Sequence, residues 1–123
     1  MKKLLIVGLL LVSSPAWAEW EKVFEDDNTT EYIDSPIRAP ERNRTKVWQM
    51  KNLKQRDEYG IMSIRTRFEY DCKEERRRIL SMSSHSEPMA GGKTIDRASD
   101  PVNWQDMPPG TVGDKILKQV CDY

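Results

Sequence analysis

Hydrophobic and polar positions alternate most regularly in residues 61–72 (IMSIRTRFEYDC). One side of the pattern is apolar except for Thr66, and the other side is polar. The apolar side holds Met62, Ile64, Phe68, Tyr70 and Cys72, and the polar side holds Ser63, Arg65, Arg67 and Glu69. Alternation with a period of two is typical of a strand with one face on a core and one in water. We therefore predict the central strand of a sheet here.

Shorter segments of the same kind lie on both sides, separated by turn residues and by a loop at 35–43 that holds two prolines. We expect strands at residues 20–24, 30–34, 44–53 and 76–86, and a short edge strand at 93–97. In segment 44–53 the two faces are not cleanly separated, and we expect Trp48 to point into the core because of its large area. Tight turns between successive strands predict an antiparallel meander.

The C-terminal segment changes to helical periodicity. Thr111 with Asp114 three positions later is a variant of the capping box. The apolar residues Val112, Ile116, Leu117, Val120 and Cys121 share one helical face. Gly113 costs about 1 kcal/mol relative to alanine, so the first turn is expected to fray. Before the helix, residues 98–109 are expected to be irregular, with Trp104 covering an edge or end of the sheet.

Residues 1–18 have the pattern of a secretory signal peptide. Lys2 and Lys3 precede a nine-residue apolar run, and small residues Ala16 and Ala18 mark a cleavage site. A membrane anchor is the alternative, but a spanning helix needs about 20 apolar residues. No cysteine lies near the cleavage point, so we expect an exported chain, periplasmic or secreted, that is not a lipoprotein and keeps no membrane segment.

Cleavage after Ala18 removes 18 of 123 residues and leaves 105, enough for one domain. Without Lys2 and Lys3, 18 basic residues remain against 20 acidic ones, a net charge of −2 with His85 neutral. This balance does not favour a nucleic-acid partner.

Two cysteines remain, and in an exported chain they most simply form one disulfide between Cys72 and Cys121. Two free thiols or an intermolecular bridge stay open as alternatives. The predicted fold class is α+β: an antiparallel meander with a C-terminal helix packed on it and clamped by one disulfide.

Several short features, in this order, resemble the surface-adhesin protein E family of small exported bacterial domains. They are Trp20, Tyr32-Ile33-Asp34, Val47-Trp48, Glu69-Tyr70-Asp71-Cys72, Arg76-Arg77-Arg78 before Ile79-Leu80-Ser81, Trp104, Pro109-Gly110-Thr111 and Val120-Cys121. The resemblance implies one adhesin-like domain over residues 19–123 that binds host matrix or serum proteins. The lack of a lipidation cysteine departs from the family's best-known member, an outer-membrane lipoprotein.

Basic residues form the strongest candidate site. Arg65 and Arg67 share the polar side of the central strand, and the neighbouring strands add alternating cations. If the meander aligns them, one sheet face carries Arg44, Lys46, Arg65, Arg67, Arg76 and Arg78. Arginine forks on such a face suit a sulfated glycan or an acidic protein segment. The alternative is a solvated face whose charges pair with Glu69, Glu74 and Glu75.

Other chemistry is less well supported by the sequence. Met82, His85 and Met89 would suit copper(I), but their spacing fits no rigid metal site. A hydroxyl nucleophile would need His85, the single histidine, beside Ser83, Ser84 and Ser86, and no G-x-S-x-G motif exists. We expect no enzyme and no cofactor.

The sequence thus predicts an exported binding domain for a protein or polyanionic glycan, with an edge strand that could pair two copies. A periplasmic envelope or stress module that binds a small molecule or metal is the competing interpretation.

Overall fold

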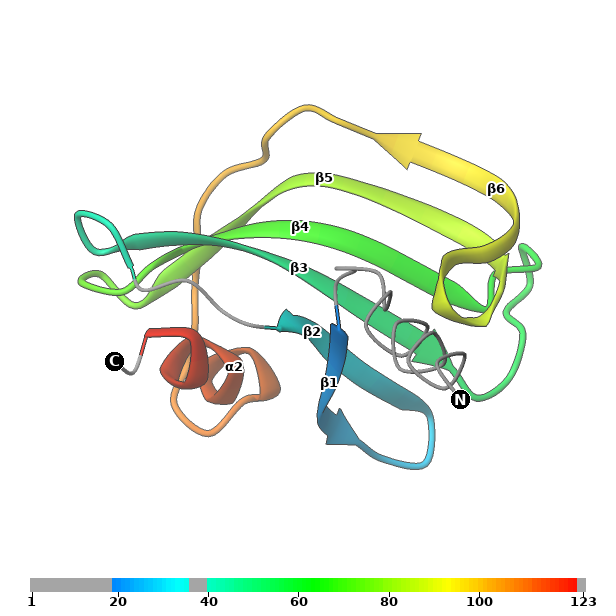
Figure 1. The fold of residues 1–123 in the computed structure, drawn as a ribbon, viewed down its shortest axis with the longest axis horizontal. Coiled ribbons are helices and arrows are strands. Elements are labelled where there is room, and N and C mark those ends of the chain that lie inside the picture. The colour runs from blue at the N-terminus through cyan, green and yellow to red at the C-terminus, as the bar shows by residue number, and fades with distance from the viewer. Residues whose placement is uncertain (1–18, 36–39, 122–123) are drawn as a thin grey trace, which may run out of the picture.

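The computed structural model describes residues 19–35 and 40–121, so the predicted signal peptide at 1–18 lies outside the described residues. Within these ranges, strands, a short 3-10 helix and an α-helix follow each other (Figure 1). They are β1 (Glu19–Glu25), β2 (Thr29–Ser35), β3 (Arg44–Leu53), β4 (Ser63–Asp71), β5 (Arg76–Glu87), η1 (Pro88–Ala90), β6 (Gly91–Ala98), β7 (Gln105–Asp106) and α2 (Val112–Cys121). Among these elements, no helix is long and apolar enough to span a membrane.

The strands form one antiparallel sheet in the order β1-β2-β3-β4-β5-β6, which confirms the predicted meander. The central strand begins at Ser63, two residues later than the alternation suggested, and Met62 instead donates its backbone N–H to the His85 carbonyl. The segment expected to be irregular contains the short strand β7, which pairs with the start of β5. β7 places the preceding residues, including Trp104, next to the β5 end of the sheet.

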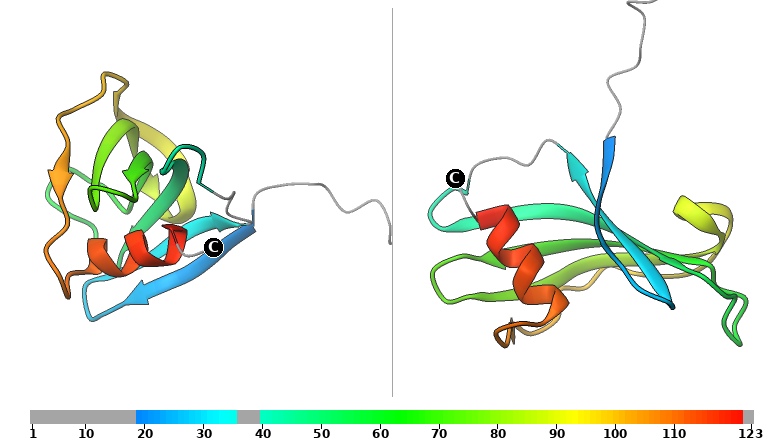
Figure 2. Two further views of the ribbon diagram at one scale, coloured as in Figure 1. Left: turned by 90° about the vertical axis from the view of Figure 1, so that its left-hand side faces the viewer. Right: turned by 90° about the horizontal axis from the view of Figure 1, so that it is seen from below.

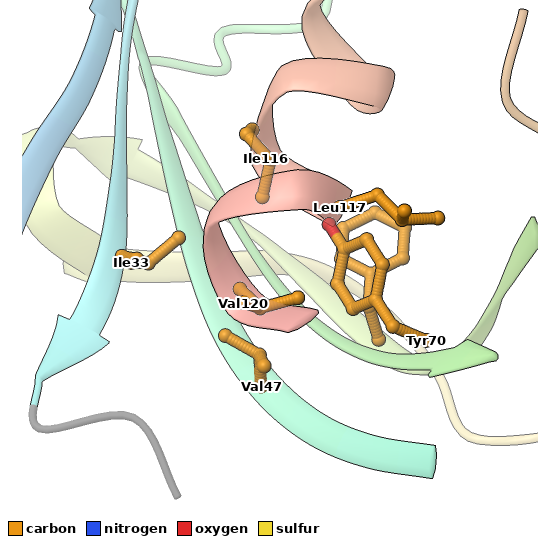
Figure 3. Close-up of a cluster of buried hydrophobic side chains, with 7 residues drawn as sticks. Ile33, Val47, Tyr70, Ile116, Leu117 and Val120 are labelled. Atoms are coloured by element: carbon orange, nitrogen blue, oxygen red, sulfur yellow. The ribbon is translucent and has the colours of Figure 1, made fainter. Parts of the chain in front are cut away.

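The hydrophobic core lies between α2 and one face of the sheet (Figure 3). Ile116, Leu117 and Val120 project from the helix, as their spacing predicts, and each is at most 2% exposed. The sheet contributes Ile33 from β2, Val47 from β3, and Phe68 and Tyr70 from β4. The sheet bends around the helix (Figure 2). The side-chain amide of Gln119 on α2 donates a hydrogen bond to the Glu21 carboxylate on β1, and Met107 packs against the core.

The start of α2 is capped as the sequence predicts. The Asp114 backbone N–H donates to the Thr111 hydroxyl over 3.1 Å. The Asp114 carboxylate accepts from the Gly110 N–H and the Lys118 ammonium, and these two donors, led by Lys118, hold the pKa of that carboxyl below its usual value. Gly113 is buried, and a β-carbon there would come within 2.6 Å of the Met107 sulfur. A glycine at this position therefore allows the helix to sit close to the segment before it.

Trp48 does not point into the core, contrary to the prediction. Val47 faces the helix and is 4% exposed, whereas Trp48 is half-buried on the opposite face of the sheet. The reason is the register between β3 and β4. Val47 pairs with Phe68, so both side chains face the core, and Trp48 pairs with Arg67, so both side chains face the opposite side of the sheet. The core-facing partners of β3 are the apolar residues of β4, and their area outweighs that of one tryptophan.

The predicted disulfide joins Cys72, just after β4, to Cys121 at the end of α2, with a Cα–Cα distance of 5.7 Å. It ties the C-terminus of the helix to the sheet across a separation of 49 residues. The core contacts and the covalent bond thus fix α2 on one face of the sheet.

A cationic face on the sheet

The register of the sheet brings six predicted cations to the face opposite α2. Arg44 lies opposite Asp71, Lys46 opposite Glu69, and Trp48 opposite Arg67. On the other side of β4, Arg76 lies opposite Asp71 and Arg78 opposite Glu69. Directly opposed residues of an antiparallel pair point to the same face. We call this surface the cationic face, and it holds Arg44, Lys46, Arg65, Arg67, Arg76 and Arg78.

A β-bulge brings Arg76 and Arg78 of β5 to this face. Arg67 pairs with Ser81, but the next residue, Phe68, pairs with Ile79, so Leu80 is an extra residue on β5. Without the bulge, the alternation along β5 would put Arg76 and Arg78 on the same side as the core. A bulge gives no signal in an alternating pattern, so the sequence alone could not decide this placement.

Acidic side chains neutralise one end of the cationic face. Asp71 is buried and accepts from Arg76 Nε over 3.0 Å, with an Arg44 nitrogen 3.9 Å away. Glu69 accepts from Arg78, with the shortest nitrogen–oxygen distance 2.7 Å. Of the acids expected to pair here, Glu69 does so, whereas Asp71 was not foreseen. We call this region the paired end.

Trp104 covers the paired end, where the sequence placed it only loosely at an edge or end of the sheet. The guanidinium carbons of Arg78, Arg76 and Arg44 lie 4.6, 4.7 and 5.0 Å from the centre of its ring. Such distances are typical of cation–π contacts. Trp104 and the two carboxylates therefore hold three of the six cations in fixed positions.

The other end of the face carries Arg65 and Arg67, which are both half-buried and both contact Trp48. Their guanidinium carbons lie 4.0 and 5.6 Å from the Trp48 ring centre. No ion pair to either arginine occurs among residues 19–35 and 40–121. Asp34 lies on the same face. Burial raises the pKa of its carboxyl and outweighs the opposing effect of the Arg65 charge. We call this region the open end.

His85 lies farther along the same face, where Ser63 of β4 is its partner. Its Nε2 is 2.7 Å from the Ser83 hydroxyl and its Nδ1 is 3.4 Å from the Thr94 hydroxyl. The serine and imidazole are thus within hydrogen-bond distance, which their closeness in sequence did not establish. The group on Nδ1 is a hydroxyl and not the carboxylate of a catalytic triad.

The three residues considered for copper do not converge. Met82 pairs with Thr66 and His85 with Ser63, so the two side chains point to opposite faces of β5. The Met89 sulfur accepts a hydrogen bond from the Asn52 amide. In the part of the chain that the structure describes, no group of three or more His, Cys, Asp or Glu side chains could hold a metal ion.

Comparison with known proteins identifies the family. The structure is similar to that of crystal form II of Haemophilus influenzae protein E, with a TM-score of 0.66 and 15% sequence identity. The similarity covers 87% of this chain and 91% of that one, and it shows a shared fold. No curated protein sequence matches the chain significantly. The family model of surface-adhesin protein E matches residues 20–122, and the chain therefore belongs to the surface-adhesin protein E family.

Proposed function

We propose that this chain is an exported, non-enzymatic binding domain that holds an acidic protein segment or a sulfated glycan on the open end of its cationic face. Membership of an adhesin family supports a binding role at the cell envelope, with a host matrix or serum protein as partner. The proposed mature domain is residues 19–123, released from the signal peptide at 1–18 and located in the periplasm or outside the cell.

The contrast between the two ends of the face carries this proposal. At the paired end, Asp71 and Glu69 already accept from the arginines beside them. At the open end, Arg65 and Arg67 have aromatic surface beneath them and no acid partner among the described residues. Stacking on a ring holds a guanidinium in place while its N–H donors stay available for a bidentate contact with a carboxylate or sulfate.

A charge reversal tests the proposal. The double variant Arg65→Glu with Arg67→Glu should lose binding to immobilised heparin and to polyglutamate, because each substitution replaces an attractive charge by a repulsive one. A matched control, Lys73→Glu with Lys115→Glu, changes the net charge equally at two exposed lysines away from the open end. The control should keep most of the binding. Equal binding by the wild-type protein and both variants would overturn the proposal.

Location is a second test. Cell fractionation and protease treatment of intact cells should find the mature chain outside the cytoplasm. A surface-exposed or released chain would support contact with host proteins, whereas a chain sealed in the periplasm would exclude adhesion and leave an acidic envelope partner for the same face.

A further inference from the structure

A row of polar side chains crosses three strands beside the open end. Arg65 on β4 lies opposite Ser83 on β5, and Ser83 lies opposite Arg97 on β6. Side chains of directly opposed residues point to the same face, with Cβ atoms about 5 Å apart. The Ser83 hydroxyl is therefore flanked by an arginine on each neighbouring strand.

The next row along these strands holds an imidazole beside this hydroxyl. His85 is 7% exposed and lies between Ser63 of β4 and Thr94 of β6. Its two ring nitrogens are next to two hydroxyls, Ser83 at Nε2 and Thr94 at Nδ1. A hydroxyl can donate or accept, so both the neutral and the doubly protonated imidazole can be accommodated without moving a side chain.

The charges around His85 are positive. Burial lowers the pKa of its imidazole, and Arg97 and Arg65 lower it further. Two acids lie in the surroundings of the site. Asp34 of β2 interacts electrostatically with Arg65, and Glu87 at the end of β5 forms an ion pair with Arg56. Neither Arg97 nor Arg65 forms an ion pair with an acid in the described ranges. The site therefore combines two cationic groups and a hydroxyl, and neither cation is paired with an acidic side chain of the described residues.

We propose that Arg97, Ser83 and Arg65 form a binding site for one compact tetrahedral oxyanion, a sulfate group, with His85 as the group that orients the Ser83 hydroxyl. The two guanidinium groups would donate to the anion from opposite sides. The hydroxyl of Ser83 would supply a third donor. When the neutral His85 accepts from Ser83 at Nε2, this donor is occupied, whereas a protonated His85 donates to the Ser83 oxygen and leaves its hydrogen for the anion.

The proposal links sulfate binding to a proton on His85. A bound anion offsets the positive field of Arg97 and Arg65, so it should raise the pKa of the imidazole, and by reciprocity protonation should strengthen anion binding. The site would take one sulfate group of a glycan bound along the open end, and this part of the inference rests on the proposed function. The binding of free sulfate does not depend on it.

The single histidine makes the site measurable, because an untagged mature chain gives one imidazole signal in NMR. We would titrate His85 from pH 4 to pH 9 in sodium sulfate and in sodium chloride of equal ionic strength. Sulfate is a suitable probe because it does not itself titrate in this range. The expected result is a higher His85 pKa in sulfate than in chloride, with sulfate affinity about fivefold stronger below this pKa than above it.

Two variants separate the site from a general effect of charge. Arg97→Gln and Ser83→Ala should each weaken sulfate binding about tenfold and remove the difference between the two salts. Lys93→Gln, which removes an exposed charge from the same strand β6, should leave both unchanged. An unchanged pKa in sulfate, or an equal rise in Arg97→Gln and the wild-type protein, would overturn the site.

The same variants distinguish this inference from the proposed function. Heparin binding that is lost in Arg65→Glu with Arg67→Glu, but is unaffected in Arg97→Gln and Ser83→Ala, would leave the proposed function standing and show that the glycan does not use the sulfate site. The His85 titration in sulfate decides whether the site itself exists. If sulfate raises the His85 pKa, but the double variant binds heparin and polyglutamate as well as the wild-type protein does, the sulfate site would stand and the proposed function would fail.

Discussion

Arg77 donates a hydrogen bond from Nη1 to the Tyr70 hydroxyl over 3.1 Å, on the side of the sheet that α2 covers. Its guanidinium carbon lies 4.1 Å from the centre of the Phe68 ring. Its Nε is buried without a hydrogen-bond partner within the described part of the chain. An arginine without an acid partner among these residues is therefore packed at the boundary of the hydrophobic core.

Removing the charge of Arg77 should cost less than removing its bulk. A buried cation with an unsatisfied N–H carries a desolvation penalty, while its stem and flat guanidinium cover apolar surface. We expect Arg77→Met to change the free energy of unfolding by less than about 1 kcal/mol or to raise it, and Arg77→Ala to lower it by about 2 kcal/mol. Urea denaturation of both variants checks this, and an equal loss in both would show that the charge itself is stabilising.

Tyr70 should make the fold sensitive to high pH. Burial raises the pKa of its hydroxyl to about 12, against a weaker opposing effect of Arg77. Because the pKa is higher in the folded state than in the unfolded one, this contribution is fully present below pH 10 and is lost as the pH rises through 12. The loss is up to about 3 kcal/mol. Urea unfolding between pH 9 and pH 12 should show a steeper decline in the wild-type protein than in Tyr70→Phe, and parallel curves would contradict it.

The strand order and the disulfide could be predicted because each follows from a clear feature of the sequence. Alternation over residues 61–72 predicts β4, and two cysteines in a chain expected to be exported favour the pair Cys72–Cys121, which the structure contains. The helix cap at Thr111 could also be predicted from the sequence, because capping depends on residues within one turn of the helix.

The side chains of the candidate site were harder to place, because they depend on pairing between strands. Trp48 and Val47 are adjacent and both apolar, and only register with Phe68 decides which one enters the core. The bulge at Leu80 changes the side of every residue before it on β5. The stacking of Trp104 on three arginines depends on the path of a segment without regular structure, which no periodicity describes.

Gly113 shows how packing can oppose helix propensity. Alanine is favoured over glycine in a helix by about 1 kcal/mol, but its β-carbon would meet the Met107 sulfur at 2.6 Å. We therefore expect Gly113→Ala to give no gain in the wild-type protein and a gain of about 1 kcal/mol when Met107 is also replaced by alanine. A double-mutant cycle measured by urea denaturation gives this coupling. Full stabilisation by Gly113→Ala alone would show that Met107 moves away freely.

The disulfide should supply a large share of the stability. In the chain-entropy model, a link between residues 49 apart stabilises the fold by roughly 4 kcal/mol. The variant Cys72→Ser with Cys121→Ser should lose about this much, and its melting temperature should no longer respond to a reductant. If the wild-type protein melts at the same temperature with and without reductant, the contacts of Ile116, Leu117 and Val120 hold the helix unaided.

Asp71 should limit polyanion binding by occupying two arginines of the cationic face. Burial alone would raise the pKa of its carboxyl, but the Glu74 N–H and the charges of Arg76 and Arg44 outweigh this and lower it. Its stabilising effect is therefore present above the usual carboxyl pKa and is lost as the pH falls through the lower folded value. Asp71→Asn should reduce the free energy of unfolding at pH 7 by about 1 to 2 kcal/mol and strengthen heparin binding about fivefold.

The matched control for this prediction is Asp114→Asn. Asp114 is also buried and also paired with a cation, Lys118, but it lies on α2, on the other side of the sheet. The control variant should lose stability without gaining heparin affinity, which separates the release of Arg44 and Arg76 from a general change in net charge. If both variants gain equally, heparin responds to net charge alone. If neither gains, Trp104 holds the paired arginines away from the ligand, and the binding surface is confined to the open end around Trp48.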